Sequence, residues 1–162
     1  MPIDISKIRL TDFIPIEFSV RGQLTNQQSA ESGVTARFHL TQDIAFFPAF
    51  AQNRIEVHLH IEATTIADQT GEPMGSGGSF GLNFGFFIDN LPELLLSDAT
   101  NVTAPPQPPP QLLSLLASIA YSTARGVLWT RLAGTALEGF NLPVVDINQL
   151  LTEIAQAKAG QA

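Results

Sequence analysis

The sequence predicts an α+β fold, in which a four-stranded antiparallel sheet is packed by one long helix and one short C-terminal helix. Four segments before residue 90 alternate apolar and polar side chains with period two, which is typical of half-buried strands with one solvated face. A run from Gln111 to about Ala133 then has helical periodicity, and a second helical pattern follows Asp146. We therefore expect a single domain (1–162) with a sheet region (1–96), a proline-rich linker (97–110) and a helical region (111–162).

Composition limits the classes of function open to this chain. Charged residues make up only 14% of the 162 residues, against about a quarter in typical soluble proteins, so we expect other subunits to cover part of the surface. The net charge is −7 and no stripe of Lys or Arg offsets it, which argues against nucleic acid and anionic membranes as partners. Most acidic residues precede residue 100; an acidic sheet docks a basic partner in one interpretation and only keeps the chain soluble in the other.

The residue types and segments that this chain lacks exclude several kinds of reactive site and several cellular locations. The chain has no cysteine, which excludes disulfides, thiolate nucleophiles and cysteine-ligated zinc. Its first residues lack the basic start and apolar core of a secretory signal. No stretch approaches the length of about 18 uninterrupted apolar residues that a membrane-spanning helix needs. We therefore expect a cytoplasmic protein.

Each alternating segment identifies the side chains that should face the core. The polar positions between them, such as Arg54, Glu56 and His58 in the third segment, should face solvent. The residues expected on the buried side are, segment by segment, Ile14, Ile16, Phe18 and Val20; Val34, Ala36, Phe38 and Leu40; Ile55, Val57, Leu59 and Ile61; and Phe80, Leu82, Phe84, Phe86 and Ile88.

Two connections are rich in turn-forming residues. The stretch from Ala67 to Gly78 contains many glycines and predicts either a mobile hairpin loop or a longer crossover between the third and fourth strands. The prolines between Pro105 and Pro110 predict a stiff polyproline II linker from the sheet to the helix. A docking motif for a domain with an aromatic groove is the alternative.

The long helix has an edge of small residues beside its apolar stripe. These residues recur at every fourth position, so they lie one above the other along the helix: Ser114, Ser118, Ser122, Gly126 and Thr130. A glycine inside a helix costs roughly 1 kcal/mol relative to alanine. We therefore expect a second helix to pack closely on this edge, within or between subunits; a small polar solvent face is the alternative.

The ends of both helices are marked by capping residues. Gly134 predicts the end of the long helix. Asp146 predicts the N-cap of the last helix, with Gln149 completing a capping box. That helix should run to about Lys158.

Patterns that suggest catalysis or metal binding are weak. The sequence Gly77-Gly78-Ser79-Phe80-Gly81 matches a nucleophile elbow, but a strand instead of a helix follows the serine, and no histidine lies downstream. His39, His58 and His60 share polar strand faces and would come together if the hairpin turned near residues 46–50, but solvated surface histidines are the simpler interpretation. We predict no catalytic residue, no metal and no cofactor.

An aromatic cluster falls where a connection between strands is expected. Phe46, Phe47 and Phe50 surround Pro48, although connections usually carry polar residues. These side chains either fold over the core or form an exposed binding surface.

Two short motifs in the helical region resemble the SecB family of export chaperones. Ala120–Gly126 (AYSTARG) matches the place where that family carries an aromatic residue, an alanine and an arginine early in its long helix. Leu142–Leu150 (LPVVDINQL) is similar to the family's entry into its last helix. The order of strands and helices resembles the family over most of the chain.

The resemblance implies a chaperone that holds unfolded polypeptides without ATP. It implies a homotetramer built as a dimer of dimers, with the interface at Ser114, Ser118, Ser122 and Gly126. It places the client-binding groove beside the Gly71–Gly78 loop, at Leu142, Val145, Ile147 and Leu150, with Phe46, Phe47 and Phe50 as further candidates. Protein export and contact with the motor protein SecA are also implied.

Other functions stay open at this point. The proline-rich linker and the short tail after Lys158 depart from the export chaperone, and a chaperone dedicated to a toxin–antitoxin pair is one alternative. A structural or adaptor subunit of a larger assembly is a second alternative. A binder of small apolar ligands, or an enzyme with a cavity between sheet and helix, is a third.

Overall fold

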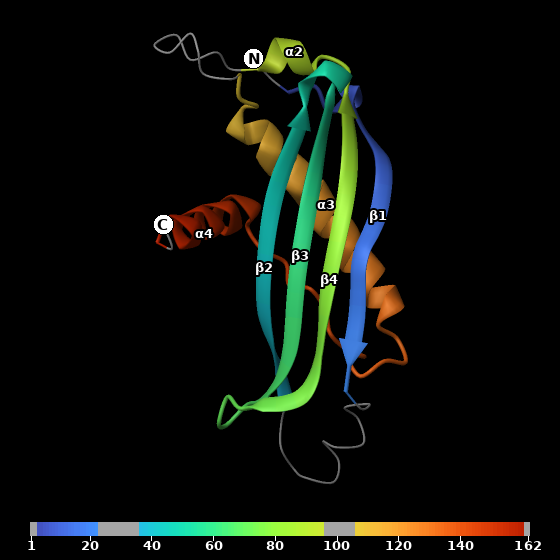
Figure 1. The fold of residues 1–162 in the computed structure, drawn as a ribbon, viewed down its shortest axis with the longest axis vertical. Coiled ribbons are helices and arrows are strands. Elements are labelled where there is room, and N and C mark those ends of the chain that lie inside the picture. Colours follow the sequence, from blue (N-terminus) through green and yellow to red (C-terminus); the bar gives the residue numbers. More distant parts are fainter. Residues whose placement is uncertain (1–2, 23–35, 96–105, 161–162) are drawn as a thin grey trace.

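The computed structural model describes residues 3–22, 36–95 and 106–160, and it confirms the predicted α+β fold (Figure 1). Its elements are β1 (Ile8–Arg21), β2 (Ala36–Ala49), β3 (Arg54–Ala67), β4 (Pro73–Ile88), α2 (Leu91–Leu94), α3 (Pro110–Arg131) and α4 (Ile147–Ala159), with short 3₁₀ turns η1 (Ile5–Lys7) and η2 (Phe50–Gln52). The four strands form an antiparallel sheet in the order β1-β4-β3-β2. α3 runs diagonally across one face of the sheet, here called the inner face, and α4 projects beyond β2 (Figure 1).

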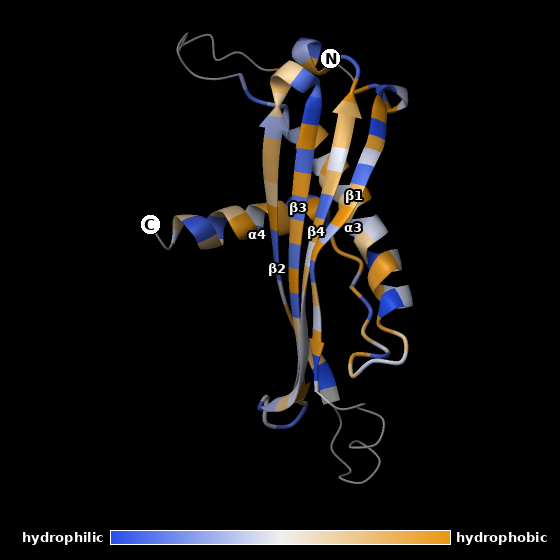
Figure 2. Cartoon of the chain, turned by 45° about the vertical axis from the view of Figure 1, so that its right-hand side comes forward, coloured by the Kyte–Doolittle hydropathy of each residue, from blue (hydrophilic) through white to orange (hydrophobic). Residues whose placement is uncertain are grey.

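The core lies between the inner face and α3. All the apolar residues predicted to be buried in β3 and β4 are buried: Ile55, Val57, Leu59, Ile61, Phe80, Leu82, Phe84, Phe86 and Ile88. α3 packs against the sheet with one stripe, made of Leu112, Leu116, Ala117, Ala120, Tyr121, Ala124 and Leu128. Figure 2 shows the alternation of hydrophilic and hydrophobic residues along β3 that produces the two faces.

α3 is long and apolar enough to cross a membrane by length and composition alone. Its buried stripe, however, belongs to the same core cluster as the central strands. Packing on the sheet therefore accounts for the part of this apolar surface that is buried.

β1 differs from the prediction because it is bulged twice. Its pairing with β4 shifts register between Leu10 and Asp12 and again between Pro15 and Glu17, and each bulge reverses which alternate residues face the core. Ile14 and Ile16 consequently point outward and are 53% and 62% exposed. Phe18 and Val20 pack against the core as predicted, joined by Phe13.

β2 continues further than the sequence predicts. Phe46 and Phe47 lie within the strand, opposite Val57 and Glu56, so the prediction that they lie in a connection is wrong. The chain turns only at η2, where Asn53 adopts a left-handed conformation with φ 52°. Phe38 and Leu40 pack against the core as predicted, whereas Val34 and the side chain of Ala36 lie outside the described residues.

The later turn also separates the histidines. The pairing of β2 with β3 puts His39 opposite Thr64, four residues from His60, which is about 14 Å along a strand. The three imidazoles therefore do not meet. Among the residues that the structure describes, no group of three or more His, Asp or Glu side chains could hold a metal ion.

β3 and β4 form a hairpin, which excludes the crossover. The turn between Ala67 and Pro73 is closed by hydrogen bonds from Ala67 N to Glu72 O (2.9 Å) and from Gly71 N to Ala67 O (2.7 Å). Gly71 has φ +71°, a conformation that glycine adopts without steric cost. Gly75, Gly77 and Gly78 lie inside β4.

The helix ends follow the predicted caps with one exception. Gly134, with φ +74°, lies two residues beyond the C-cap of α3 at Leu132. The Asp146 carboxylate accepts hydrogen bonds from Asn148 N and Gln149 N at the start of α4. The Gln149 side chain donates to Glu153 Oε1 (2.8 Å), so it does not complete a capping box.

Only the last part of the linker falls within the described residues. Pro109 has φ −63° and ψ 143°, close to the polyproline II geometry that the sequence predicts. Pro110 then begins α3, where a proline at the first position costs no hydrogen bond.

Candidate functional site

A groove runs along the exposed side of α3, beside the Asn141–Asp146 segment and the start of α4. Three adjoining pockets make it up, with volumes of about 280, 270 and 260 Å³. The first two share Ser122 and Arg125, and the last two share Val144, Val145 and Asp146. The groove is lined by Gln42, Ser114, Ser118, Tyr121, Ser122, Arg125, Gly126, Trp129, Asn141, Val144, Val145, Asp146, Ile147, Asn148, Gln149, Leu150 and Glu153. We call it the helical groove.

Side-chain contacts hold the two helices in place around the groove. Ser114 Oγ donates to Asn148 Oδ1 at 2.6 Å, joining the start of α3 to the start of α4. Tyr121 is buried, and its hydroxyl donates to Gln42 Oε1 on β2 at 3.1 Å. The walls of the groove are therefore fixed to the sheet and to each other.

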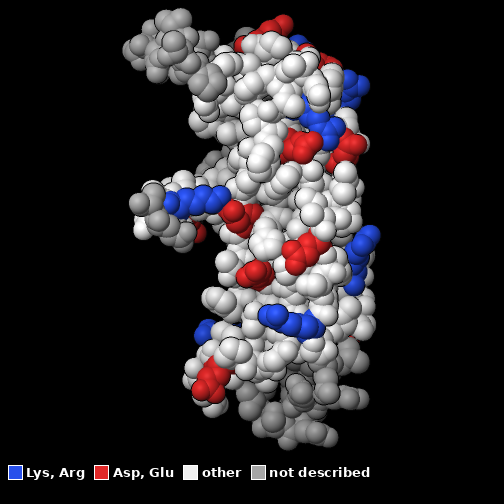
Figure 3. Space-filling view, in the orientation of Figure 1, with Lys and Arg blue, Asp and Glu red and all other residues white. Residues whose placement is uncertain are grey.

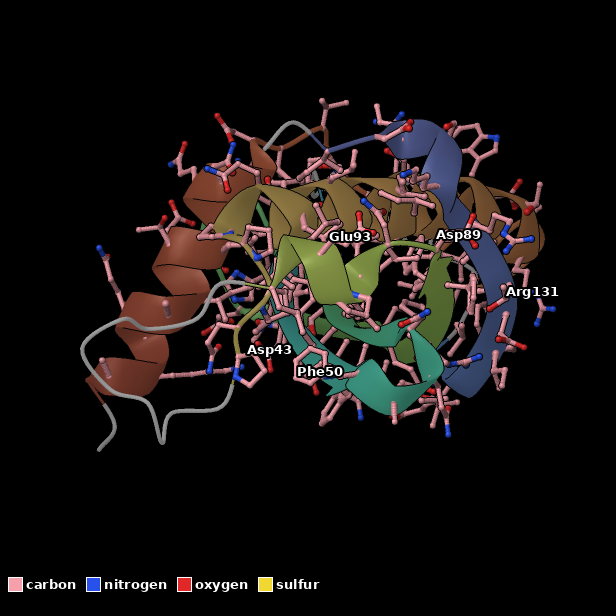
Figure 4. All side chains as sticks on the ribbon, turned by 90° about the horizontal axis from the view of Figure 1, so that it is seen from above. Asp43, Phe50, Asp89, Glu93 and Arg131 are labelled. Carbon is pink, nitrogen blue, oxygen red and sulfur yellow. The ribbon has the colours of Figure 1, made fainter. Side chains whose placement is uncertain are left out.

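α4 is also tied to the outside of the sheet edge. Lys158 Nζ, near the end of α4, lies 2.8 Å from Asp43 Oδ1 on β2. Gln42 and Asp43 are neighbours in a strand, so their side chains point to opposite faces. Asp43 lies between the sheet and α4, whereas Arg131 lies at the far side of the molecule beside β1 (Figure 4).

Burial gives Tyr121 a structural role instead of a chemical one. Removal from water raises the pKa of Tyr121 to about 12, against smaller opposing effects of the Gln42 hydrogen bond and the nearby Arg125. The phenol therefore stays protonated at physiological pH and acts as a hydrogen-bond donor. A general base or nucleophile would need a lower pKa.

Exposed apolar side chains stand at the mouth of the groove. Trp129 is 59% exposed and Val144 is 84% exposed, and both line the pockets. Val145, next to Val144 in the chain, is partly buried and packs against the core. Large apolar side chains grouped beside a groove are typical of surfaces that bind other polypeptides.

The residues predicted to bind clients separate into two groups. Val145, Ile147 and Leu150 line the helical groove. Leu142 is buried in the core beneath it. The three phenylalanines lie elsewhere, and so does the glycine-rich hairpin at residues 71–78, because neither lines a pocket of the groove.

The phenylalanines are separated because neighbours in a strand face opposite sides. Phe46 packs against the core, and Phe47, on the outer face, contacts the His58 ring in a tilted arrangement with ring centroids 4.4 Å apart. Phe50 lies in the η2 turn, which joins β2 to β3 at one end of the sheet (Figure 4).

The small-residue edge of α3 forms one wall of the groove. Ser114, Ser118, Ser122 and Gly126 all line it, so the two predicted sites, for clients and for assembly, share this surface. A Cβ added at Gly126 would have no neighbour within 4 Å. Within the described part of the protomer, then, nothing packs closely against this glycine.

Sequence reasoning missed Arg125, Trp129 and Val144 as groove residues. Arg125 and Trp129 are four residues apart on α3, directly beside Ser122 and Gly126, and this spacing was the available signal. The exposure of Val144 depends on where α4 lies, which no local pattern reveals.

The outer face of the sheet carries charges that neutralise one another. Acidic and basic side chains are mixed across this face (Figure 3). Arg54 contacts Asp12 (2.5 Å) and Glu56 (3.1 Å). Hydrogen bonds from the Thr11 hydroxyl and Arg54 lower the pKa of Asp12 below 3.8. Asn83, with His58 and Arg54, lowers the pKa of Glu56 below 4.5.

The serine of the nucleophile-elbow pattern lies in the middle of β4. Ser79 pairs with Ser19 on β1 and with Glu62 on β3. The strand continues on both sides of it, so the sharp turn from strand to helix that such a nucleophile needs is missing at this residue.

Comparison with known proteins identifies the fold. The sequence matches no protein-family model and no curated protein. Among solved structures, it is similar to a SecB-like chaperone of Mycobacterium tuberculosis, in complex with a ChAD peptide from the HigA1 antitoxin. The two share 12% sequence identity with a TM-score of 0.55, over 86% of this chain and 91% of that chain. The chain thus has the fold of a SecB-like chaperone.

Proposed function

We propose that this protein is an ATP-independent chaperone that holds segments of non-native polypeptides in the helical groove. The observation that carries this proposal is a row of three adjoining pockets, with Trp129 and Val144 exposed among the residues that line them. The SecB-like fold supports it, because a SecB-like chaperone with this fold has been solved with an antitoxin peptide bound. We infer a non-catalytic role without cofactor or metal.

The groove suits binding by burial and needs no chemical step. Each large apolar side chain that leaves water contributes roughly 2 kcal/mol. A few such contacts give an affinity high enough to hold an unfolded chain and low enough for the chain to dissociate without ATP. Val145, Ile147 and Leu150 are the predicted client residues that line this surface, with Leu142 supporting them from the core.

We further propose a homotetramer assembled as a dimer of dimers. Charged residues are few, and the small-residue edge around Gly126 has open space above it. Ile14 and Ile16 are exposed on the edge strand β1. All three features are expected of surfaces that other copies cover.

Two client classes are proposed for a cytoplasmic protein of this kind. One is unfolded precursors for export, delivered to SecA. The other is an antitoxin, and the antitoxin peptide bound to the similar M. tuberculosis chaperone favours this second class. An adaptor subunit that does not hold unfolded chains is the competing function.

Aggregation protection separates holding from an adaptor role. A chemically denatured model protein is diluted into buffer with and without this protein, in the absence of nucleotide, and light scattering is followed. Suppression at near-stoichiometric amounts is the expected result. Undiminished scattering would contradict the holding activity. A mass of 17.4 kDa in solution, that of one protomer, would contradict the tetramer.

A further inference from the structure

The charges that line the helical groove are unequally satisfied. Asp146 accepts two backbone amides of α4 (2.9 and 3.3 Å), and Glu153 accepts the Gln149 side-chain amide (2.8 Å). Arg125, which lines the middle pocket together with Asp146, forms no ion pair with any residue in the described ranges. Of these three charged groups, only the Arg125 guanidinium has neither a hydrogen bond nor an ion pair to a described residue.

Within the protomer, the position of Arg125 makes it accessible to a bound chain. It lines two of the three pockets at their junction and is only partly exposed. Trp129 lies one helical turn further along the same wall and is 59% exposed. A guanidinium pairs with a carboxylate through two parallel hydrogen bonds, and partial burial strengthens such a pair.

We propose that Arg125 makes the groove select polypeptide segments in which an Asp or Glu lies two positions from a large apolar residue. This inference rests on the proposed holding function and names the chemistry of its clients. The carboxylate pairs with Arg125, and the apolar side chain covers Trp129.

The spacing follows from the geometry of the two chains. Side chains four residues apart on a helix are separated by about 6 Å. In an extended segment, residues two apart point to the same side and are about 6.8 Å apart. From Ser114 to Trp129, α3 rises about 22 Å, enough for about seven extended residues.

The fluorescence of Trp129 can report the binding of a peptide to the groove. Trp129 is the single tryptophan of the chain, so a change in tryptophan emission on adding a peptide reports the groove. The probes are unstructured peptides of about ten residues, without tryptophan, that carry one Asp two positions from a Phe. A second peptide has Asn in place of the Asp, and a third moves the Asp next to the Phe. Anisotropy of labelled peptides gives an independent measurement.

The expected result is that the first peptide binds about threefold to tenfold tighter than either of the others. The difference should disappear in Arg125→Gln and persist in part in Arg125→Lys. Arg131→Gln is the matched control, because it removes the same charge from the same helix at a residue that instead stacks over Phe18. About 0.5 M salt should reduce the discrimination.

Each outcome separates the inference from the holding function. If all three peptides bind equally well, the selectivity is overturned and the holding function stands. If none binds and aggregation protection is also lacking, both proposals fall. If Arg125→Gln changes the oligomer mass and leaves peptide affinity unchanged, Arg125 serves contacts between copies, and the selectivity is overturned.

Discussion

The Arg54 guanidinium on β3 reaches across β4 to the Asp12 carboxylate on β1, with 2.5 Å between Nη1 and Oδ2. It passes over Gly85, where an added Cβ would overlap its guanidinium. The absence of a side chain at Gly85 thus lets one ion pair connect two strands that are not neighbours. This pair lies on the outer face, opposite α3.

Replacing Gly85 with alanine should displace Arg54 and weaken the contact with Asp12. We expect the free energy of unfolding to fall by about 1 kcal/mol, measured by urea denaturation. The matched control is the same substitution in an Arg54→Ala background, where the added methyl has no guanidinium to displace. An equal loss in both backgrounds would show that Arg54 is not the cause.

The Asp12 carboxylate should make stability depend on acid pH. Its pKa is lowered in the folded protein, so the stabilisation is fully present above the ordinary value of 3.8 and is lost as pH falls through the lower folded value. Asp12→Asn should therefore be less stable than the parent above about pH 5, and the difference should shrink below pH 3.8. Urea denaturation over a pH series measures this, and a constant difference would contradict it.

Asp146 should decide how firmly α4 borders the groove. Its carboxylate caps the helix, and loss of such a cap costs about 1 kcal/mol. Asp146→Ala should lower the thermal midpoint and reduce aggregation protection, because α4 forms one wall. Asp146→Ser keeps a capping oxygen and is the control; if it behaves like alanine, capping does not explain the effect.

Trp129 and Val144 should contribute to client binding and little to folding. Both are mostly exposed, so Trp129→Ser and Val144→Ser should change the free energy of unfolding by less than about 0.5 kcal/mol. Aggregation protection should fall clearly in the double variant. Ile5 is similarly exposed, at 64%, and lies far from the groove in sequence, so Ile5→Ser serves as the control.

Gly126 distinguishes an assembly surface from a solvent face. Within the protomer an added side chain meets no neighbour, and alanine would raise the helix propensity by roughly 1 kcal/mol. We therefore expect Gly126→Leu to keep the protomer folded, as circular dichroism would show, and to reduce the oligomer mass measured by light scattering. An unchanged mass would mean that no second helix packs closely there.

The strands that the sequence predicts best are the ones with neighbours on both sides. β3 and β4 pair in unbroken register from Arg54 to Thr64, and their ladder shifts only beyond Thr64, close to the hairpin turn. β1 has only one neighbouring strand and contains two bulges. The amino-acid sequence does not reveal these bulges, so uninterrupted alternation wrongly predicts that Ile14 and Ile16 face the core. The location of Phe47 is predicted wrongly for a similar reason, because the face on which it lies depends on where the β2–β3 hairpin turns.

The groove could be predicted only in part. Val145, Ile147 and Leu150 follow from the helical period after Asp146, and the small-residue edge follows from its four-residue spacing. Trp129 becomes a groove residue because Asn141 of the segment after α3 lies across from it, and Val144 because it borders the start of α4. The position of α4 depends on tertiary contacts between residues far apart in the chain, such as Ser114 with Asn148 and Lys158 with Asp43.

The contact of Lys158 with Asp43 has a consequence for how sheets of different copies can grow. When both edge strands of a sheet are unpaired, strands of other copies can add at both edges, and repeated addition produces a fibre. Here the middle of β2 is obstructed by α4, and β1 is left as the accessible border. If two copies paired through their β1 strands, neither would have an accessible edge strand left. The assembly would then stop at a closed oligomer of finite size.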